Sequence, residues 1–286
     1  MHLNIATINA LNGIASLDER VPILATEIKR IQPDILCLQE TLHLPGFNGQ
    51  LEPRIGLVLD NANLSLAVLS RSMENFLPIL SSTAIAYCPE TLDLIENGTI
   101  KFGDTPYFRF PTPDVAYAVL RTRCPESPRD IIVFSAHLAW GGENGGERLS
   151  AVKRIEGFAA HLAARYPDAP VFLAGDFNET PTGAAIRYLT GNSEAVPGAF
   201  WIDAWRWLKG DEPGITQFPT SKYAAATALR NGIENPATLP ERRLDYIMVR
   251  SWAYGKLGAN PQIDLWGSTA DGDVSDHLGL ALRFDL

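Results

Sequence analysis

The sequence has few cysteines and no long apolar run, and each absence narrows the class of protein. Its three cysteines, Cys37, Cys88 and Cys124, form no CxxC pair, which favours a reducing compartment and argues against a structural zinc site. No stretch approaches 18 apolar residues, so no transmembrane helix is predicted. The first residues lack the basic and apolar segments of a secretory signal. We therefore predict a cytoplasmic protein.

Positive charge is also scarce. The 286 residues include 24 Lys and Arg against 33 Asp and Glu, a formal net charge of −9. A broad basic surface for nucleic acid is therefore not expected, although a bound divalent metal would change the sign of a site locally. With 46% hydrophobic and 20% charged residues, the chain should bury a large core and is not a disordered chain.

What is present is a series of apolar segments without an internal repeat or a clear linker, so we predict one domain over residues 1–286. A strand is predicted at 3–8. A helix should follow from about 19 to 31, with Asp18 as its N-cap and its apolar residues on one face. A buried strand at 34–40 then completes a strand–helix–strand unit of a size that suits a crossover.

Between about residues 54 and 123 the pattern changes to short apolar runs separated by turn residues. These runs, at 55–59, 64–69, 76–87, 92–102 and 115–121, are predicted to be strands. Since no helix is expected between them, they should pair antiparallel.

The last part of the chain returns to strands flanked by helices. The predicted order is a strand at 130–137, a helix at about 147–166, a strand at 171–176, a helix at about 182–189 and a strand at 244–249. Thr180 and Pro181 look like the cap and first position of the second helix. Residues 191–242 are expected to be loop apart from a short helix near 202–208. A final strand should follow His277.

One strand end carries two polar residues of chemical interest. The apolar run from Val171 breaks at Gly175 and delivers Asp176 and Asn178, at the kind of strand end where open α/β sheets bind ligands. An acid there can bind a metal or orient a water, and an amide can donate hydrogen bonds to an oxyanion without adding charge. A tight turn with an Asx cap is the ordinary structural alternative.

Similar polar residues stand at the ends or starts of other predicted strands. The full set is Asn9, Glu40, His137, Asp176, Asn178, Asp245, Asp276 and His277. Each alone could be a turn, core or surface residue. A carboxylate at the end of a buried strand, however, carries a desolvation cost unless a partner group pairs with it. Since Lys and Arg are few around them, a divalent cation is a candidate partner, and oxygen ligands favour Mg²⁺ or Mn²⁺ over zinc.

These residues also form an ordered series of motifs. The series is Asn9, Leu38-Gln39-Glu40, Ser135-Ala136-His137-Leu138, Gly175-Asp176-Phe177-Asn178, Leu244-Asp245-Tyr246 and Ser275-Asp276-His277. It resembles the motifs of the endonuclease/exonuclease/phosphatase superfamily, which contains the DNase I-like nucleases, and the match runs from residue 3 to about 284. The resemblance implies an α/β fold, a four-layer sandwich of two face-to-face mixed β-sheets flanked by helices. It also implies metal-dependent hydrolysis of a phosphoester.

The resemblance further implies a metal site that holds Mg²⁺ or Mn²⁺. By position, Glu40 resembles the principal metal ligand and Asp276 a second acid of the metal site. Asn9 resembles the amide that supports the metal or the substrate phosphate.

Five further residues resemble the family's catalytic residues. Asp176 resembles the acid that positions or deprotonates the attacking water, and Asn178 the amide that holds the phosphate. His277 resembles the histidine that touches the scissile phosphate, with Asp245 orienting it, and His137 falls where some branches carry a histidine near the phosphate or leaving group.

The substrate is less constrained. Arg243, in the pair Arg242-Arg243, and Arg148 are candidates to bind a substrate phosphate, although surface arginines are often merely solvated. Four tryptophans could rim the pocket or simply pack under loops: Trp140, Trp201, Trp205 and Trp207.

Three functions are open. A phosphodiesterase or phosphatase acting on a small or lipid-like phosphoester fits the acidic chain best. A magnesium-dependent endonuclease or exonuclease on DNA or RNA would be expected to carry basic residues along a groove. A non-catalytic module that binds a phosphate ligand is disfavoured, because each matched position holds a chemically competent residue. The expected partner is thus the phosphoester substrate, and we expect a monomer.

Overall fold

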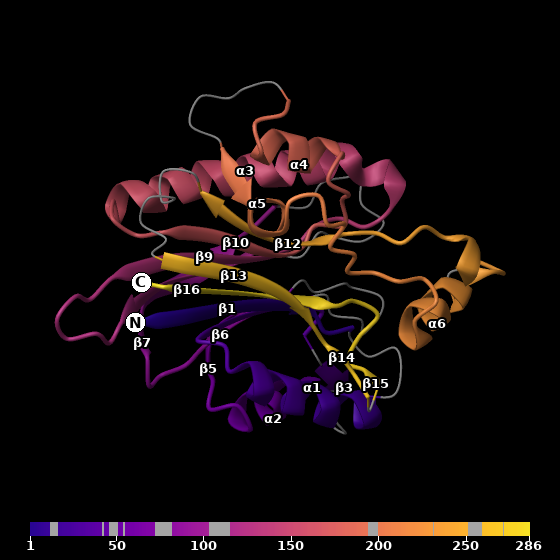
Figure 1. The fold of residues 1–286 in the computed structure, drawn as a ribbon, viewed down its shortest axis with the longest axis horizontal. Coiled ribbons are helices and arrows are strands. Elements are labelled where there is room, and N and C mark those ends of the chain that lie inside the picture. Colours follow the sequence, from indigo (N-terminus) through magenta and orange to yellow (C-terminus); the bar gives the residue numbers. More distant parts are fainter. Residues whose placement is uncertain are drawn as a thin grey trace.

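The computed structural model describes residues 1–11, 17–41, 43–45, 51–53, 55–71, 82–102, 115–193, 200–230, 232–250, 259–270 and 272–286. Two six-stranded sheets lie face to face between two layers of helices (Figure 1). This arrangement confirms the predicted four-layer α/β sandwich. No helix among the described residues is both long and apolar enough to cross a membrane.

The first sheet has the strand order β13-β16-β1-β2-β6-β5. The strands are β1 His2–Asn9, β2 Ile35–Gln39, β5 Ser65–Arg71, β6 Ser82–Tyr87, β13 Ala259–Trp266 and β16 Gly279–Asp285. β1 and β2 are parallel and are connected through α1 (Leu17–Ile31), whereas the other pairs are antiparallel. The helices α1 and α2 (Ile55–Asp60) cover the outer face of this sheet (Figure 1).

The second sheet has the order β11-β12-β10-β9-β8-β7. Its strands are β7 Leu92–Ile100, β8 Val115–Thr122, β9 Asp130–His137, β10 Val171–Asp176, β11 Trp201–Asp203 and β12 Asp245–Arg250. β9 and β10 form its parallel pair and are connected through α3 (Gly145–Arg165). With α4 (Ala184–Leu189), α3 covers the outer face (Figure 1). Each sheet is thus built around one strand–helix–strand unit.

The two-residue period of a strand decides which side chains reach the space between the sheets. On β1, Leu3 and Ile5 belong to the apolar core between the sheets, whereas Ala6 and Ile8 pack in the core beneath α1 and α2. Asn9 continues the odd-numbered series and so lies on the inner side at the carboxyl end of its strand.

The same alternation holds at three other strand ends. Val133 of β9, Ala174 of β10 and Ile247 of β12 all belong to the core between the sheets. His137 and Asp176 follow these residues by an even number of positions, and Asp245 precedes Ile247 by two. The apolar pattern that fills the core therefore also delivers the three polar side chains to the inner face of the second sheet.

Glu40 departs from this alternation. Cys37 on β2 faces the core between the sheets and Leu38 faces the outer core, so a continued strand would place residue 40 on the outer side. The strand instead ends at Gln39, and Glu40 adopts a left-handed backbone conformation with φ of 48°. Such a conformation costs about 1–2 kcal/mol in a residue with a Cβ, and it takes the Glu40 side chain out of the strand's alternation.

Several sequence predictions at the element level were wrong. Residues 55–59 form the helix α2 rather than a strand, because Ile55, Val58 and Leu59 repeat at helical spacing and pack in one core. The helix α4 begins at Ala184 with Gly183 as its N-cap, so Thr180 and Pro181 lie before it. α1 begins at Leu17, which places Asp18 inside its first turn.

The sequence did not predict some of the elements, and part of one predicted strand lies outside the residues that the structure describes. β13 had no counterpart in the prediction. Within 191–242 the short helix predicted near 202–208 is confirmed as α5 (Ala204–Lys209), whereas β11 and α6 (Lys222–Arg230) lie in the expected loop and were missed. The smaller elements are β3 His43–Pro45, β4 Leu51–Pro53, a 3-10 turn Gly142–Asn144, a 3-10 turn Pro236–Thr238, β14 Ser268–Thr269 and β15 Gly272–Asp273. Residues 76–81 of the predicted run 76–87 lie outside the described residues.

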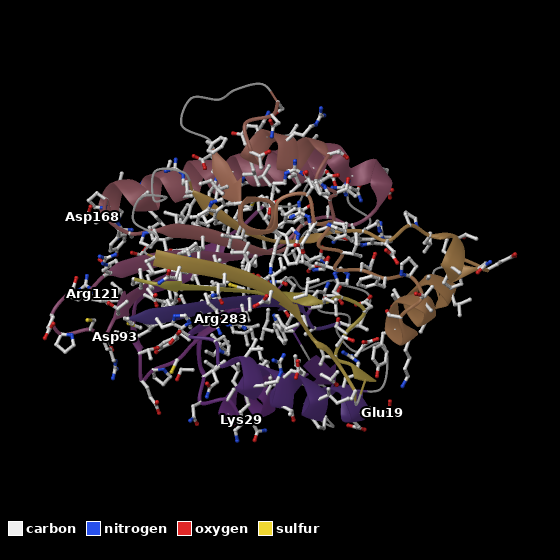
Figure 2. The ribbon with its side chains drawn as sticks, in the orientation of Figure 1. Glu19, Lys29, Asp93, Arg121, Asp168 and Arg283 are labelled. Atoms are coloured by element: carbon white, nitrogen blue, oxygen red, sulfur yellow. The ribbon has the colours of Figure 1, made fainter. Side chains whose placement is uncertain are left out.

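The helix α6 stands at one end of the sandwich and connects to its outer layer. Lys222 Nζ of α6 lies 3.1 Å from Oε2 of Glu19 on α1. Figure 2 shows Glu19 on the outer helix layer, close to α6, and Asp168 at the opposite end of the molecule. This end, with α6, is the one toward which the carboxyl ends of β1, β2, β9 and β10 point (Figure 1).

Candidate active site

Asn9 joins the two sheets at the carboxyl ends of their parallel strands. Its Nδ2 donates to Glu40 Oε1 at 3.1 Å and to Asp176 Oδ2 at 3.1 Å. Its Oδ1 accepts a hydrogen bond from the Leu11 backbone at 3.0 Å, which fixes the amide orientation. One buried amide therefore brings a carboxylate of the first sheet and a carboxylate of the second sheet together.

His137 lies against the same two carboxylates. Its Nε2 is 3.6 Å from Asp176 Oδ2 and 3.9 Å from Glu40 Oε1. The strand register explains this position, because His137 is the direct partner of Asp176 in the parallel pair of β9 and β10.

Asp245 and His277 form a buried pair on the other side of Asp176. His277 Nδ1 lies 2.8 Å from Asp245 Oδ2, and His277 Nε2 lies 3.9 Å from Asp176 Oδ2. Burial raises the pKa of Asp245 to about 6, despite the opposing charge of His277. Burial lowers the pKa of His277, but the carboxylates of Asp245 and Asp176 outweigh this and hold that pKa well above its usual value. The pair has the geometry in which an acid orients an imidazole.

Asn178 fixes Asp176 from the following turn. Its backbone N–H donates to Asp176 Oδ1 at 2.8 Å, and its Nδ2 donates to the Leu138 carbonyl at 3.0 Å. The second contact of Nδ2, with Asp176 Oδ2, is longer at 3.4 Å. Asn178 has a left-handed backbone conformation, with φ of 48°, which Asn adopts more readily than most residues.

Asp276 stands at the edge of this cluster. It is buried and accepts a hydrogen bond from Ser275 Oγ at 3.2 Å. Burial raises its pKa; the charge of His277 opposes this effect, whereas the charges of Glu40 and Asp176 add to it. Its carboxylate is thus within electrostatic range of Glu40.

Arg20 is a buried residue that the sequence did not single out. Its guanidinium donates to the carbonyls of Ala10, Leu11 and Val274 at 2.7–3.1 Å. It therefore ties the segment after β1 to the segment before Asp276. Burial lowers its pKa, while Asp276 and Glu40 oppose that effect.

The donor set fits a hard divalent cation. The cluster contains three buried carboxylates, Asp176, Asp245 and Asp276, and the partly buried Glu40. Asp245 Oδ1 is buried with no hydrogen-bond partner in the described structure. Ligand atoms of Asp176, Asp245 and His277 all lie within 4.8 Å of one another and form a possible metal site. Oxygen-rich sites of this kind suit Mg²⁺ or Mn²⁺.

The two arginines predicted to bind substrate have other partners in the structure. Arg148 donates to Glu179 Oε2 at 2.9 Å and to the carbonyls of Ala139 and Gly141 at 2.8 and 2.7 Å. Arg243 makes a two-pronged ion pair with Asp203 at 2.9 and 2.7 Å. Both side chains are buried, and the groups that they bind do not belong to the cluster.

The tryptophans separate into two kinds. Trp201 and Trp205 are buried and donate through Nε1 to Glu156 Oε2 and to the Glu212 carbonyl, and Trp207 is partly buried beside the core between the sheets. Trp140, three residues after His137, is 54% exposed. Of the four, it is the exposed one, and it follows the strand end that carries His137.

Two residues that contact the Asp245–His277 pair or its strand come from the segment that was expected to be loop. Gln217 Nε2 lies 3.1 Å from His277 Nε2, and the buried Thr216 accepts hydrogen bonds at Oγ1 from the backbones of Leu244 and Asp245. Neither residue follows a predicted strand, so the pattern that identified the other site residues could not identify them.

Similarity to known sequences extends over most of the chain. A sequence model of the Endonuclease/Exonuclease/phosphatase family matches residues 6–277. Protein angel of Drosophila melanogaster is 26% identical over 185 residues, 63% of this chain and 49% of that protein. Carbon catabolite repressor protein 4 homolog 3 of Arabidopsis thaliana is 22% identical over 182 residues, 60% of this chain and 35% of that protein. The match thus spans about half or less of these relatives.

Solved structures share the fold over the whole chain. The human Nocturnin catalytic domain with bound sulfate has a TM-score of 0.66 at 17% identity, and the alignment covers 99% of this chain and 94% of that one. D. rerio TDP2 complexed with a single-strand DNA product has a TM-score of 0.67 at 19% identity, covering 100% and 99%. At such identities the likeness shows the fold.

Proposed function

Because this chain belongs to the endonuclease/exonuclease/phosphatase family, we propose that it is a phosphodiesterase that requires Mg²⁺ or Mn²⁺. The observation that supports this most directly is the Asn9 amide, which holds Glu40 and Asp176 together at 3.1 Å each. The oriented pair of Asp245 and His277 stands beside Asp176. A group of acids, an amide and an imidazole is thereby gathered where a phosphate could be bound, attacked and protonated.

Glu40 and Asp276, supported by Asn9, are the residues that we propose hold the cation. When bound, such a cation neutralises the nonbridging phosphate oxygens and stabilises the departing oxygen. The group of Asp176, Asp245 and His277 is the alternative set. We prefer the first set because His277 Nδ1 already bonds Asp245 at 2.8 Å, which suits an acid–base role.

The proposed hydrolysis uses Asp176 to bind the attacking water and accept its proton. Asn178 keeps Asp176 oriented through its backbone N–H. One hydrogen of Asn178 Nδ2 is held by Leu138, and the other is the one that we propose turns to a phosphate oxygen. As water bonds to phosphorus, the bond to the leaving oxygen breaks.

The two histidines act on the phosphate and the leaving group in this proposal. Asp245 holds His277 through Nδ1, so that Nε2 faces Asp176 and donates a hydrogen bond or proton to the phosphate. His137 Nε2, between Asp176 and Glu40, meets the phosphate or the leaving oxygen. An acid–base contribution of this kind is worth about 10² to 10⁴-fold in rate.

Small or lipid-like phosphodiesters are the substrates that we propose first, because the chain is acidic. Single-stranded nucleic acid is a second candidate, favoured by Trp140. Arg148 binds the carbonyls on both sides of Trp140, and Asn144 Nδ2 binds the Trp140 carbonyl at 2.5 Å. An exposed indole on a fixed backbone is suited to stack against a base. The TDP2 neighbour was solved with a single-strand DNA product.

A panel of substrates tests the proposed function. Bis-p-nitrophenyl phosphate, p-nitrophenyl phosphate, sphingomyelin, and single- and double-stranded DNA would be offered with Mg²⁺, with Mn²⁺ and with EDTA, at two salt concentrations. We expect turnover of the diester that EDTA abolishes and added metal restores. DNA hydrolysis that falls steeply with salt would favour the nuclease, and no hydrolysis of any ester with either metal would contradict the proposal.

A further inference from the structure

The arginine pair at 242 and 243 is divided by the fold. Arg243 is 6% exposed and is bound to Asp203, whereas Arg242 is exposed. The Arg242 guanidinium donates to the neutral side chain of Gln217, at 2.5 Å from Oε1. The other end of this amide, Nε2, lies 3.1 Å from His277 Nε2. A chain of two contacts therefore leads from the proposed catalytic histidine to an exposed cation.

The segment that carries Gln217 is fixed on both sides. Its backbone pairs with that of Arg242 in both directions, at 2.9 and 3.1 Å. The carbonyl of the preceding Thr216 accepts from the Leu278 backbone at 2.7 Å. The positions of Gln217 and Arg242 relative to His277 are therefore set by backbone hydrogen bonds rather than by side-chain packing alone.

Arg242 differs from the other arginines around the cluster. Arg20, Arg148 and Arg243 are buried, with exposed fractions of 1%, 4% and 6%, and their terminal nitrogens donate to carbonyls or carboxylates of the protein. Arg242 contacts a neutral amide, which leaves its positive charge uncompensated by that partner. A guanidinium presents several donors in a planar fork that matches the oxygens of a phosphate.

We propose that Arg242, oriented by Gln217, binds a second phosphate group of the substrate, next to the phosphodiester that is hydrolysed. This inference rests on the proposed function and narrows its substrate class to phosphodiesters that carry a further phosphate. Two sources share this chemistry: a nucleotide strand and a phosphorylated headgroup. In either case Gln217 Nε2 lies beside His277, where it meets the phosphate that His277 contacts.

Matched pairs of substrates test this inference. The dinucleotide TpT would be compared with 5′-phosphorylated TpT, and glycerophosphoinositol with its 4-phosphate, with bis-p-nitrophenyl phosphate as the diester that lacks a second phosphate. The enzymes would be the wild type, Arg242→Gln, Arg242→Lys, and the control Arg206→Gln. Arg206 is an exposed arginine of α5 that pairs with Asp211 at 3.0 Å.

We expect Arg242→Gln to lower kcat/KM about 10- to 100-fold for a substrate with the second phosphate, mainly through KM. Bis-p-nitrophenyl phosphate should be hydrolysed within about twofold of the wild-type rate, since it lacks the group that Arg242 binds. Arg242→Lys should recover part of the loss because it keeps the charge without the planar fork. Arg206→Gln should match the wild type on every substrate.

The matched substrate pair on which Arg242→Gln lowers kcat/KM identifies the source of the second phosphate, either a nucleotide strand or a phosphorylated headgroup. Equal losses on substrates with and without it, or no loss on either pair, would overturn the inference. Failure of the proposed function is a separate result: wild-type protein that hydrolyses none of these diesters with Mg²⁺ or Mn²⁺.

Discussion

At the scale of the single residue, Gly175 allows the backbones of β9 and β10 to approach each other closely beside the site. It pairs with Ala136 in the register of β9 and β10, and the next pair in that register is Asp176 with His137. Its φ is 141°, and a Cβ at this position would lie 2.0 Å from the Ala136 carbonyl oxygen. Two backbones can approach this closely only without a side chain, so the glycine permits the closeness of Asp176 and His137.

Gly175→Ala should therefore destabilise the protein by about 2–4 kcal/mol, from the unfavourable φ together with the backbone clash. Urea unfolding followed by circular dichroism measures this change. The control is Gly157→Ala on the exposed side of α3, where nothing lies within 4 Å of the added Cβ. This substitution should stabilise by about 0.5–1 kcal/mol. Equal stabilities for the two variants would contradict the account.

Cysteine reactivity gives a second test at this scale. Cys37 is buried in the core between the sheets, and burial raises the pKa of its thiol far above the usual value. Cys88 and Cys124 are only partly buried. In native protein at pH 8, a thiol reagent should modify Cys88 and Cys124 but leave Cys37 unmodified, whereas unfolding in urea should expose all three. Peptide mapping by mass spectrometry reads out each position, and rapid native labelling of Cys37 would refute its burial.

At the scale of the element, a buried ion pair fastens α3 to the second sheet. Glu156 of α3 bonds Arg250 of β12, with Nη2 at 2.5 Å from Oε1, and accepts from Trp201 Nε1 of β11 at 2.6 Å. All three side chains are buried. Removal of the acid would take away the carboxylate that balances the charge of this buried guanidinium, and this loss destabilises a protein more than the absence of both charges.

Glu156→Leu alone should destabilise the protein by about 3–5 kcal/mol, whereas Glu156→Leu with Arg250→Met should recover a large part of that loss. Chemical unfolding of the wild type, both single variants and the double variant gives the coupling free energy. If the changes in the free energy of unfolding of the two single variants simply add up in the double variant, the ion pair itself does not stabilise the protein.

How far the sequence predicts the elements depends on the pattern that each carries. Continuous apolar runs predicted β1, β2, β9, β10 and β12, and with them the ends that carry Asn9, His137 and Asp176. The run at 55–59 was too short to separate a strand from the helix that forms. Arg20 and Gln217 reach the site through hydrogen bonds to backbone carbonyls and through a side-chain amide. No periodicity in the sequence predicts such contacts, so only the three-dimensional structure identifies these residues as part of the site.

At the scale of the whole molecule, the two halves, each a sheet with its outer helices, share one structural feature. In each sheet a parallel pair of strands is joined through a helix, α1 or α3. The fourth residue of each helix is a buried arginine, Arg20 or Arg148, which binds carbonyls of the segment after the first strand of the pair. The site lies where the strand ends of the two halves meet, joined by the Asn9 amide.

The central claim is that side chains from both halves act as one hydrolytic site, and rate measurements on variants test it most directly. Turnover of bis-p-nitrophenyl phosphate with Mg²⁺ or Mn²⁺ would be measured for the wild type, Asp176→Asn and His277→Ala, with thermal unfolding as the check on folding. The control is Asp168→Asn, an exposed position at the far end of the molecule (Figure 2).

We predict that each site variant folds and loses about 10² to 10⁴-fold in kcat, whereas Asp168→Asn keeps the wild-type rate. A folded Asp176→Asn or His277→Ala variant with wild-type turnover would contradict the account.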